Sequence, residues 1–279
     1  SGLIIVSLVV LSVISIRNFT QDKTDLIKLQ TNDTAKLIAE KLRTEISARV
    51  EGLQVFDRFA GFSGATAKSK KGARRKPAAA VTDRANLSAG SGVLRVSRYL
   101  FDAGEIRRGY SRDIVAEQQK VEIAPGAFAR DEERLAERLK AVFRGQTLLL
   151  TRTQSFGKPV WFIAFPVIEG EVAQRVITAY LSTEVLDSAF TSRAYTSFFV
   201  DSDRALVVHS DKKETLAARN FKDHPAVEFL QGQETRTGFS IYRNNATKHD
   251  YFGAFSKLDI GTTAVVVEME KDRALESVN

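Results

Sequence analysis

The sequence contains no cysteine, and this absence excludes a disulfide framework and any metal site with cysteine ligands. It has three histidines, His209, His224 and His249, and none of them has the HExxH spacing or a similar spacing of metal ligands. The G-x-S-x-G nucleophile motif and the phosphate-binding loops GxxxxGK(S/T) and GxGxxG are absent too. We therefore expect no catalysis, no metal ion and no cofactor in this region, although an enzymatic output module could lie outside it.

The overall composition is that of a folded globular protein. Apolar residues make up 43% and charged residues 27% of the 279 positions, which excludes an intrinsically disordered chain. The net charge of +7 could indicate nucleic acid or an anionic surface as a partner. Much of that excess lies in one run, Lys68–Pro77, so the net charge says little about the folded parts.

The basic run belongs to a tract of small and basic residues, 61–92, with almost no large apolar side chain. Such a tract cannot bury enough surface to order itself, so we predict a flexible loop. A nuclear-localisation or nucleic-acid-binding patch would have a similar composition. No aromatic residues are interleaved with the basic ones, so a platform for stacking bases is missing and we expect no nucleic acid partner.

An uncharged apolar run opens the sequence, from Leu3 to Ile16, and only three serines interrupt it. It is somewhat shorter than the roughly 20 residues that span a bilayer. The chain starts with Ser1 rather than methionine, so we interpret residues 1–16 as part of a transmembrane helix that begins upstream. The alternative is the hydrophobic centre of a secretory signal peptide, for which Ser15–Asn18 offers only a poor cleavage site.

A long amphipathic segment follows the apolar run without a proline. Its apolar positions recur mostly at spacings of three or four, with charged residues between them, which predicts one stalk helix over 17–60. Such a helix exceeds the average length in globular proteins and must pack along a domain, against a second copy of the chain, or both. We expect a homodimer along it, with an ordinary core-covering helix as the alternative. The apolar positions are Leu26, Leu29, Ala35, Ile38, Leu42, Ile46, Val50, Leu53 and Phe56.

From Val93 onward the hydrophobic period changes from helical to strand-like, and one order of elements occurs twice. Each copy has two strands, a helix and three further strands joined by tight turns, which indicates antiparallel sheets with helices on one side and an α+β fold class. The first copy predicts strands at 93–101, 106–110, 146–156, 159–168 and 174–181 and helices at 130–143 and 184–193. The second predicts strands at 197–200, 205–210, 238–242, 251–258 and 262–269 and helices at 223–230 and 269–278.

Several short stretches of the second copy occur in a characteristic order. They are Val200-Asp201, Val207–Asp211, Arg219-Asn220, His224-Pro225, Tyr251-Phe252 and Val265–Glu268. Together with the long N-terminal helix, they resemble a double Cache (dCache) sensor domain, over roughly residues 25–272. The resemblance implies a long N-terminal helix followed by two PAS-like antiparallel-sheet units, a membrane-distal one at 93–190 and a membrane-proximal one at 191–270. Residues 271–279 would start a helix towards a second membrane span.

The resemblance implies the extracytoplasmic sensing region of a bacterial-type receptor in the inner (plasma) membrane, with residues from about 17 to 279 on the periplasmic side. A small molecule of unknown class would bind the distal unit and shift the helices relative to each other, which requires a different affinity for the two states. The output module would be a chemoreceptor tail, a histidine kinase, a nucleotide cyclase or a cyclic-di-GMP enzyme. The alternative is a membrane-anchored module that recognises a protein or polymer, or dimerises, without a small ligand.

The candidate ligand-binding residues of the distal unit are Tyr110, Arg152, Trp161 and Tyr180. Arg152 could hold a carboxylate through two hydrogen bonds. Strand alternation places Trp161 on one face of its strand and its neighbour Phe162 on the other. Core packing is the alternative for Trp161 and Tyr180, and an exposed strand position is the alternative for Arg152.

This sequence departs from the resembled family at the expected ligand site. The amino-acid-binding subgroup has an aspartate near the end of the last distal strand, where this chain has Tyr180, and an Arg-x-Trp-aromatic group, of which Trp161-Phe162 lacks the arginine. Amino acids are therefore not the expected ligand. In the proximal unit His209, Tyr242 and Tyr251 could face a second pocket, although we expect His209 to bond the neighbouring loop.

The segment Asp201-Ser202-Asp203 begins like a calcium-binding loop, but the glycine and the distal glutamate of such a loop are absent. We therefore predict a hairpin turn at this point. In the resembled family this turn usually carries a glycine, and here the sequence continues with Arg204 and Ala205.

Overall fold

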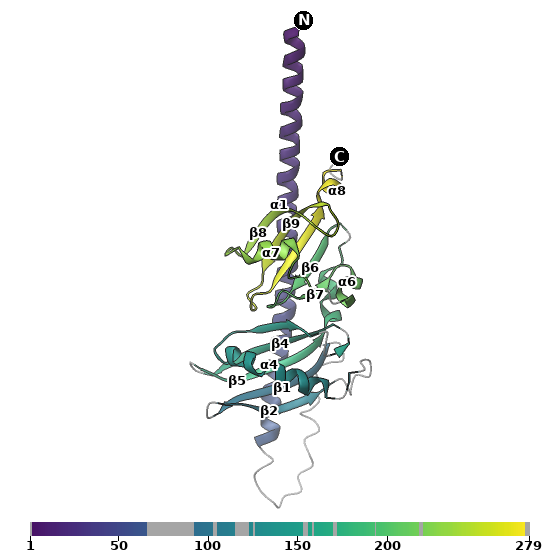
Figure 1. The fold of residues 1–279 in the computed structure, drawn as a ribbon. Helices are drawn as coiled ribbons and strands as arrows, with labels where there is room; N and C mark the ends of the chain where they lie inside the picture. The colour runs from purple at the N-terminus through teal and green to yellow at the C-terminus, as the bar shows by residue number, and fades with distance from the viewer. Residues whose placement is uncertain are drawn as a thin grey trace, which may run out of the picture.

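The computed structural model describes residues 2–65, 92–102, 105–114, 123–124, 126–152, 156–157, 159–169, 172–192, 194–217 and 220–276. One long helix passes two five-stranded antiparallel sheets, as expected for the α+β class (Figure 1). Most of the predicted basic loop, residues 66–91, lies outside the described residues.

Helix α1 runs without interruption over Gly2–Ala65, so the apolar run and the amphipathic segment form one element of 64 residues. At 1.5 Å per residue this helix is about 96 Å long. It extends past the predicted end at residue 60, and its N-terminal part projects beyond the proximal unit (Figure 1). No helix in the described part of the chain is both long and apolar enough to cross a membrane.

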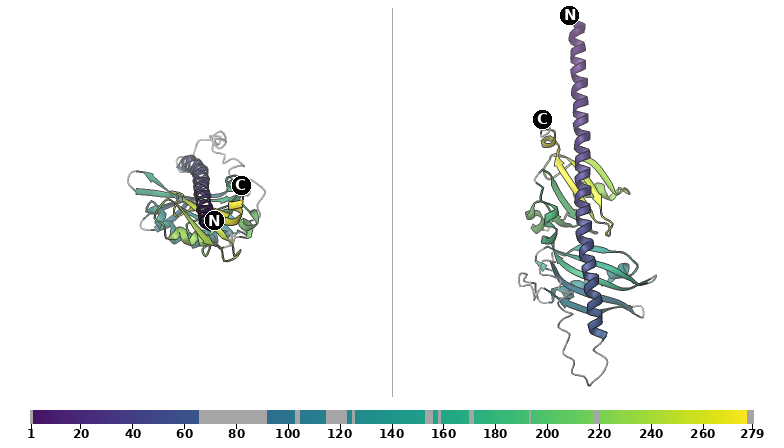
Figure 2. Two further views of the ribbon diagram at one scale, coloured as in Figure 1. Left: turned by 90° about the horizontal axis from the view of Figure 1, so that it is seen from above. Right: turned by 180° about the vertical axis from the view of Figure 1, so that it is seen from behind.

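One face of α1 is buried along both units, and Figure 2 shows from behind how the helix crosses them. The predicted single stripe needs a correction at its start, because Leu26 is 52% and Leu29 60% exposed. With 3.6 residues per turn, these two positions lie about a third and a half of a turn away from Ile38, which faces the core. The buried positions of the described helix include Ile27, Thr31, Ala35, Ile38, Leu42, Ile46 and Leu53.

The distal unit is a sheet with the strand order β2-β1-β5-β4-β3. Helix α4, Ala127–Phe143, covers one face and α1 the other, so the sheet separates two apolar cores. The predicted alternation is confirmed, because Trp161 packs in the core next to α1 and Phe162 in the core next to α4. The strands are β1 Val93–Asp102, β2 Glu105–Asp113, β3 Leu148–Thr151, β4 Val160–Glu169 and β5 Val172–Ser182.

The proximal unit repeats this topology with the order β7-β6-β10-β9-β8, which confirms the predicted repeat. A 3₁₀ helix, Thr183–Ala189, links the units where a longer helix to residue 193 was predicted. Helix α6, Lys212–Ala217, was not predicted. The other elements are β6 Thr196–Val200, β7 Leu206–His209, α7 Pro225–Gln231, β8 Thr237–Arg243, β9 Asp250–Lys257, β10 Ala264–Glu270 and α8 Lys271–Glu276.

Buried Asp201 joins the two units at the turn between β6 and β7. One of its carboxylate oxygens accepts a hydrogen bond of 2.6 Å from the backbone of Thr151 in the distal strand β3. The other accepts from the backbone of Asp203 at 2.8 Å and of Ala205 at 2.9 Å, which confirms the predicted hairpin turn. Arg204 has a φ of 65°. It therefore adopts the left-handed conformation that glycine would adopt without strain.

Candidate functional site

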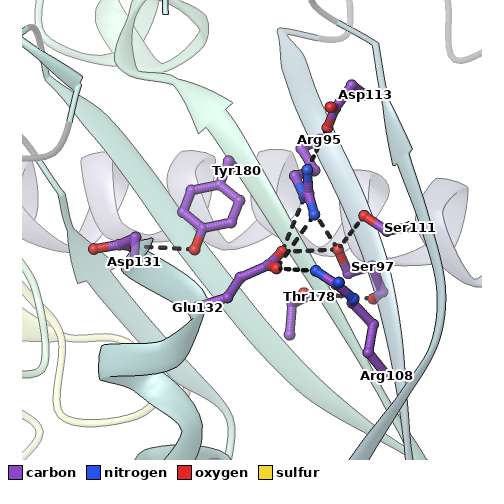
Figure 3. Close-up of polar contacts among 9 residues, drawn as sticks. All are labelled: Arg95, Ser97, Arg108, Ser111, Asp113, Asp131, Glu132, Thr178 and Tyr180. Carbon is purple, nitrogen blue, oxygen red and sulfur yellow. Dashed lines mark hydrogen bonds and ion pairs between the residues drawn. The ribbon is translucent and has the colours of Figure 1, made fainter. Parts of the chain in front are cut away.

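Arg95 of β1 and Glu132 of α4 form a buried ion pair between the distal sheet and its helix (Figure 3). Arg95 Nε lies 2.9 Å from Glu132 Oε1, and Nη2 lies 3.2 Å from Oε2, so the guanidinium binds both carboxylate oxygens. The side chains are 10% and 6% exposed. Burial alone would lower the pKa of Arg95, but the charges of Glu132 and Asp113 raise it overall.

Glu132 is the centre of a wider polar network. Its carboxylate also accepts hydrogen bonds from Ser97 Oγ at 3.0 Å and from Arg108 Nη1 at 2.9 Å. Arg108 belongs to the edge strand β2, and its side chain is 49% exposed. The network therefore connects the buried Arg95 with an arginine that reaches the solvent.

Asp131, the residue before Glu132, accepts hydrogen bonds from a second group of side chains. It is fully buried and accepts a hydrogen bond of 3.1 Å from the hydroxyl of Tyr180. Arg152 Nε donates to Asp131 Oδ2 at 2.8 Å, and Arg152 Nη2 binds the other oxygen. Burial, reinforced by the charge of Asp131, raises the pKa of Tyr180 above its usual value, so the phenol stays protonated and donates.

Aromatic rings enclose Tyr180 beneath α4. The ring centroids of Phe128 and Phe162 lie 5.0 Å from that of Tyr180, and the centroid of Phe156 lies at 5.4 Å. The guanidinium of Arg95 lies over the Phe128 ring at 5.2 Å from its centroid, within range of a cation–π interaction. The site thus combines packed aromatic rings with three arginines and two carboxylates.

The structure brings two of the four predicted site residues together and places the other two elsewhere. Arg152 and Tyr180 meet on Asp131. Trp161 is fully buried on the opposite face of the sheet, where its indole N–H donates to Ser182 O at 3.1 Å. Tyr110 also faces α1, with its ring centroid 6.3 Å from that of Phe56. The four residues therefore do not line one site, because alternation along the strands sends Trp161 and Tyr110 to the side of α1.

The sequence analysis missed Arg95, Arg108, Asp131 and Glu132. One signal could have revealed the two acids, because they lie on the apolar face of a predicted helix. Phe128 and Leu135 each lie three or four residues from both acids, at helical spacing, and both are buried with them. Charged residues on the buried face of a helix are rare unless they are paired.

The proximal unit confirms the structural role expected of His209, whose Nδ1 accepts a hydrogen bond of 2.9 Å from the backbone of Asp211. Among the described residues, His249, Glu270 and Asp272 have potential metal-ligating atoms within 4.8 Å of one another. His249 and Asp272 are exposed, and such surface groups are common without an ion. This group is not sufficient for a metal site.

Comparison with solved structures identifies the fold. The chain aligns with the ligand-binding domain of the Pseudomonas fluorescens chemoreceptor CtaA in complex with L-isoleucine, at a TM-score of 0.53 and 13% identity over 92% of this chain and 98% of that one. The sensory domain of the Campylobacter jejuni chemoreceptor Tlp3 with bound isoleucine gives 0.51 and 12% over 92% and 97%. The extracellular domain of rpHK1S-Z16, described as a histidine kinase, gives 0.54 and 13% over 90% and 98%. No protein-family model and no curated protein matches the chain.

Proposed function

Because the chain has the double Cache fold, we propose that it is the extracytoplasmic ligand-sensing region of a transmembrane signalling receptor. A small molecule binds the distal unit between α4 and the sheet, and the change passes through the flanking helices to an output module outside this chain. The observation that supports the site best is the buried Arg95–Glu132 pair. A buried ion pair stabilises a protein little compared with apolar residues of similar volume. A dense group of such pairs therefore fits a role in ligand recognition better than a role in stabilising the fold.

The ligand's anionic or hydrogen-bonding group would pair with Arg108 or Arg152. Both arginines are partly exposed, at 49% and 20% of the side chain, so either can change partner at a lower cost than Arg95. Tyr180 would contribute its hydroxyl and ring. Trp161 and Tyr110 would act indirectly, by packing the sheet against α1.

Thermal unfolding of the purified protein in the presence of organic acids, amines, amino acids, purines and sugars tests this proposal. A ligand at 100 times its Kd stabilises the fold by about 2.7 kcal/mol, which is readily visible as a shift of Tm. Arg108→Ala and Tyr180→Phe should reduce the shift. Arg107→Ala is the matched control, because this neighbour on β2 is 60% exposed and pairs with Asp102 and Glu105 instead. A shift that survives both site variants, or no shift with any compound, would contradict the proposal.

The second part of the proposal places the receptor in the inner membrane as a homodimer. Residues 2–16 of α1 enter the bilayer, consistent with exposed apolar side chains such as Leu11 and Ile16. Further along, Leu29 and Leu37 are 60% and 68% exposed on the side away from the sheets, where a second copy of α1 would cover them. Leu29→Glu with Leu37→Glu should then produce a monomer in analytical ultracentrifugation. Leu216→Glu is the control, because this equally exposed leucine lies on α6.

The alternative function, recognition of a protein or polymer without a small ligand, would use the basic run Lys68–Lys76. Deletion of residues 66–91 separates the two functions. Small-molecule binding by the distal unit should survive the deletion, whereas polymer recognition should be lost.

A further inference from the structure

The two units place ionisable side chains on corresponding faces of their sheets. Because the strand orders match, β10 corresponds to β5, and α7 corresponds to α4. In the distal unit Tyr180 of β5 faces α4. In the proximal unit Glu268 of β10 lies on the face that α7 covers, next to Tyr242 of β8 and to His224 at the start of α7.

Glu268 is buried without a full set of hydrogen-bond partners. Its side chain is 4% exposed, and Oε1 lies 3.3 Å from His224 Nε2. The hydroxyl of Tyr242 lies against the same carboxyl group. Within the described part of the chain, neither Glu268 Oε1 nor Tyr242 Oη has a hydrogen-bond partner of normal geometry. Both polar atoms are thus turned towards each other in an apolar environment where an unmade hydrogen bond is costly.

The two buried carboxylates of the distal unit each pair with an arginine, and Glu268 differs from them among the described residues. Glu132 pairs with Arg95, and Asp131 pairs with Arg152. Among the described residues, no lysine or arginine forms an ion pair with Glu268. Burial accordingly raises the pKa of Glu268 to about 8. At neutral pH the acid therefore keeps its proton, and it ionises in this buried position only when something else supplies a positive charge.

His224 cannot supply that charge at neutral pH. Its Nδ1 accepts a hydrogen bond of 3.4 Å from the backbone of Ala226, which assigns the ring proton to Nε2, on the side of Glu268. Burial, followed by the nearby His209, lowers the pKa of His224 to about 4, so the ring is neutral. The neutral imidazole lies 3.3 Å from Glu268 but brings no positive charge, so it is not the counter-ion.

Aromatic rings surround this group in a way that suits an organic cation. Phe221 stacks on His224 with a centroid distance of 5.2 Å, and Tyr251 stacks on Tyr242 at 6.2 Å. Phe198 lies edge-on to His224 at 5.2 Å. Ring faces attract ammonium groups, most strongly where water is excluded.

We infer that the proximal unit has a second ligand-binding site at Glu268, Tyr242 and His224, and that its ligand is a small protonated amine. When the ligand binds, Glu268 releases its proton to solvent. The ammonium group then donates to the resulting carboxylate and to the Tyr242 hydroxyl, whose oxygen atoms lack partners of normal geometry among the described residues. His224 is 16% exposed, and Tyr251 is half-buried, so the outer edge of the group reaches the surface. This site does not depend on ligand binding by the distal unit.

Isothermal titration of the full chain with ethylammonium and 2-phenylethylammonium, and with ethanol and 2-phenylethanol as uncharged matches, tests this inference. The amines should bind and the alcohols should not. Glu268→Gln keeps the shape of the side chain and should weaken amine binding by at least about tenfold, because a hydrogen-bonded charge pair is lost. Tyr242→Phe should weaken it by a smaller factor and provides a second variant if Glu268→Gln does not fold.

Two controls locate the binding. Glu228→Gln removes an exposed carboxylate from α7 and should leave the affinity unchanged. Asp131→Asn alters the distal site only, and amine binding should persist in this variant. The inference is overturned if neither amine binds, if Glu268→Gln and Tyr242→Phe both bind as tightly as the unmodified protein, or if Asp131→Asn abolishes binding.

Discussion

Arg138 of the distal helix α4 forms two hydrogen bonds with the carboxylate of Asp203 in the proximal unit, one of them 2.9 Å long. Asp131 lies on the same helix, seven residues earlier, and therefore on the same side. The helix that holds the candidate distal site thus also contacts the turn between β6 and β7. The hydrogen bond from Arg138 lowers the pKa of Asp203, which stays charged.

The stability of the contact between the two units should depend far more on Asp201 than on Arg138. Asp201→Ala leaves three backbone N–H groups without their acceptor, so we expect a loss of about 2–4 kcal/mol in the free energy of unfolding. Arg138→Ala breaks a pair whose side chains are 37% and 44% exposed, so we expect about 0–1 kcal/mol. Urea unfolding of both variants measures the difference. Equal losses of unfolding free energy in the two variants would mean that the buried carboxylate of Asp201 does not stabilise the contact between the units.

Glu132→Gln should destabilise the distal unit. The amide keeps the size of the side chain but removes the charge opposite Arg95, and breaking a buried pair typically costs about 3–5 kcal/mol. Arg95 keeps Asp113 at 2.7 Å, so we expect the lower part of that range. Glu133→Gln, at the exposed neighbouring position of α4, should change stability by less than about 0.5 kcal/mol. Similar unfolding midpoints for both variants would contradict the central role of Glu132.

The stability of the fold should fall as the pH rises through the titration of Glu268. Its pKa is raised from 4.5 to about 8 in the folded state. Between those values the folded protein binds one more proton than the unfolded chain, so this stabilisation is complete below pH 4.5 and lost towards pH 8. Each unit of raised pKa corresponds to about 1.4 kcal/mol.

His224 acts in the opposite direction. Its pKa is lowered from 6.5 to about 4, so its stabilisation is complete above pH 6.5 and lost as the pH falls towards 4. Urea midpoints at several pH values, compared between the unmodified protein and Glu268→Gln, separate the two titrations. In the variant, the loss of stability as the pH rises from 4.5 towards 8 should vanish, and the loss as the pH falls from 6.5 towards 4 should remain. If the loss towards pH 8 is unchanged in the variant, Glu268 is already ionised in the folded state at neutral pH.

Gly253→Ala should displace Tyr242. A Cβ atom at Gly253 would lie 2.4 Å from Cε1 of the Tyr242 ring, a distance that carbon atoms do not tolerate. Overpacking of this kind costs about 1–3 kcal/mol. Gly232→Ala is the matched control, because its Cβ would meet only a backbone oxygen at 3.9 Å. Loss of amine binding in Gly253→Ala with binding retained in Gly232→Ala would connect the ring position with the proximal site.

The repeated strand order could be predicted because alternation and tight turns are local in sequence. Phe162 and Trp161 occupy the two faces, as their adjacent positions in one strand require. The distal network could not be predicted in the same way. Arg95 and Glu132 are separated by 37 residues, and their contact depends on how α4 crosses the sheet. Helix α6 was missed because its single buried residue is Thr215, so it has no apolar period.

Helix α1 serves as a common reference for the position of both units. Near its distal end Asp57 pairs with Arg98 and Arg175 of the distal sheet. Closer to the N-terminus, where α1 passes α8 (Figure 1), Lys23 donates a hydrogen bond of 3.2 Å to Leu275 O. A displacement of the whole domain moves α1 and α8 together and changes nothing between them. The spacing between α1 and α8 changes only when the proximal unit, to which α8 is attached through β10, shifts along α1. The relative position of the two helices is therefore insensitive to motion of the domain as a whole.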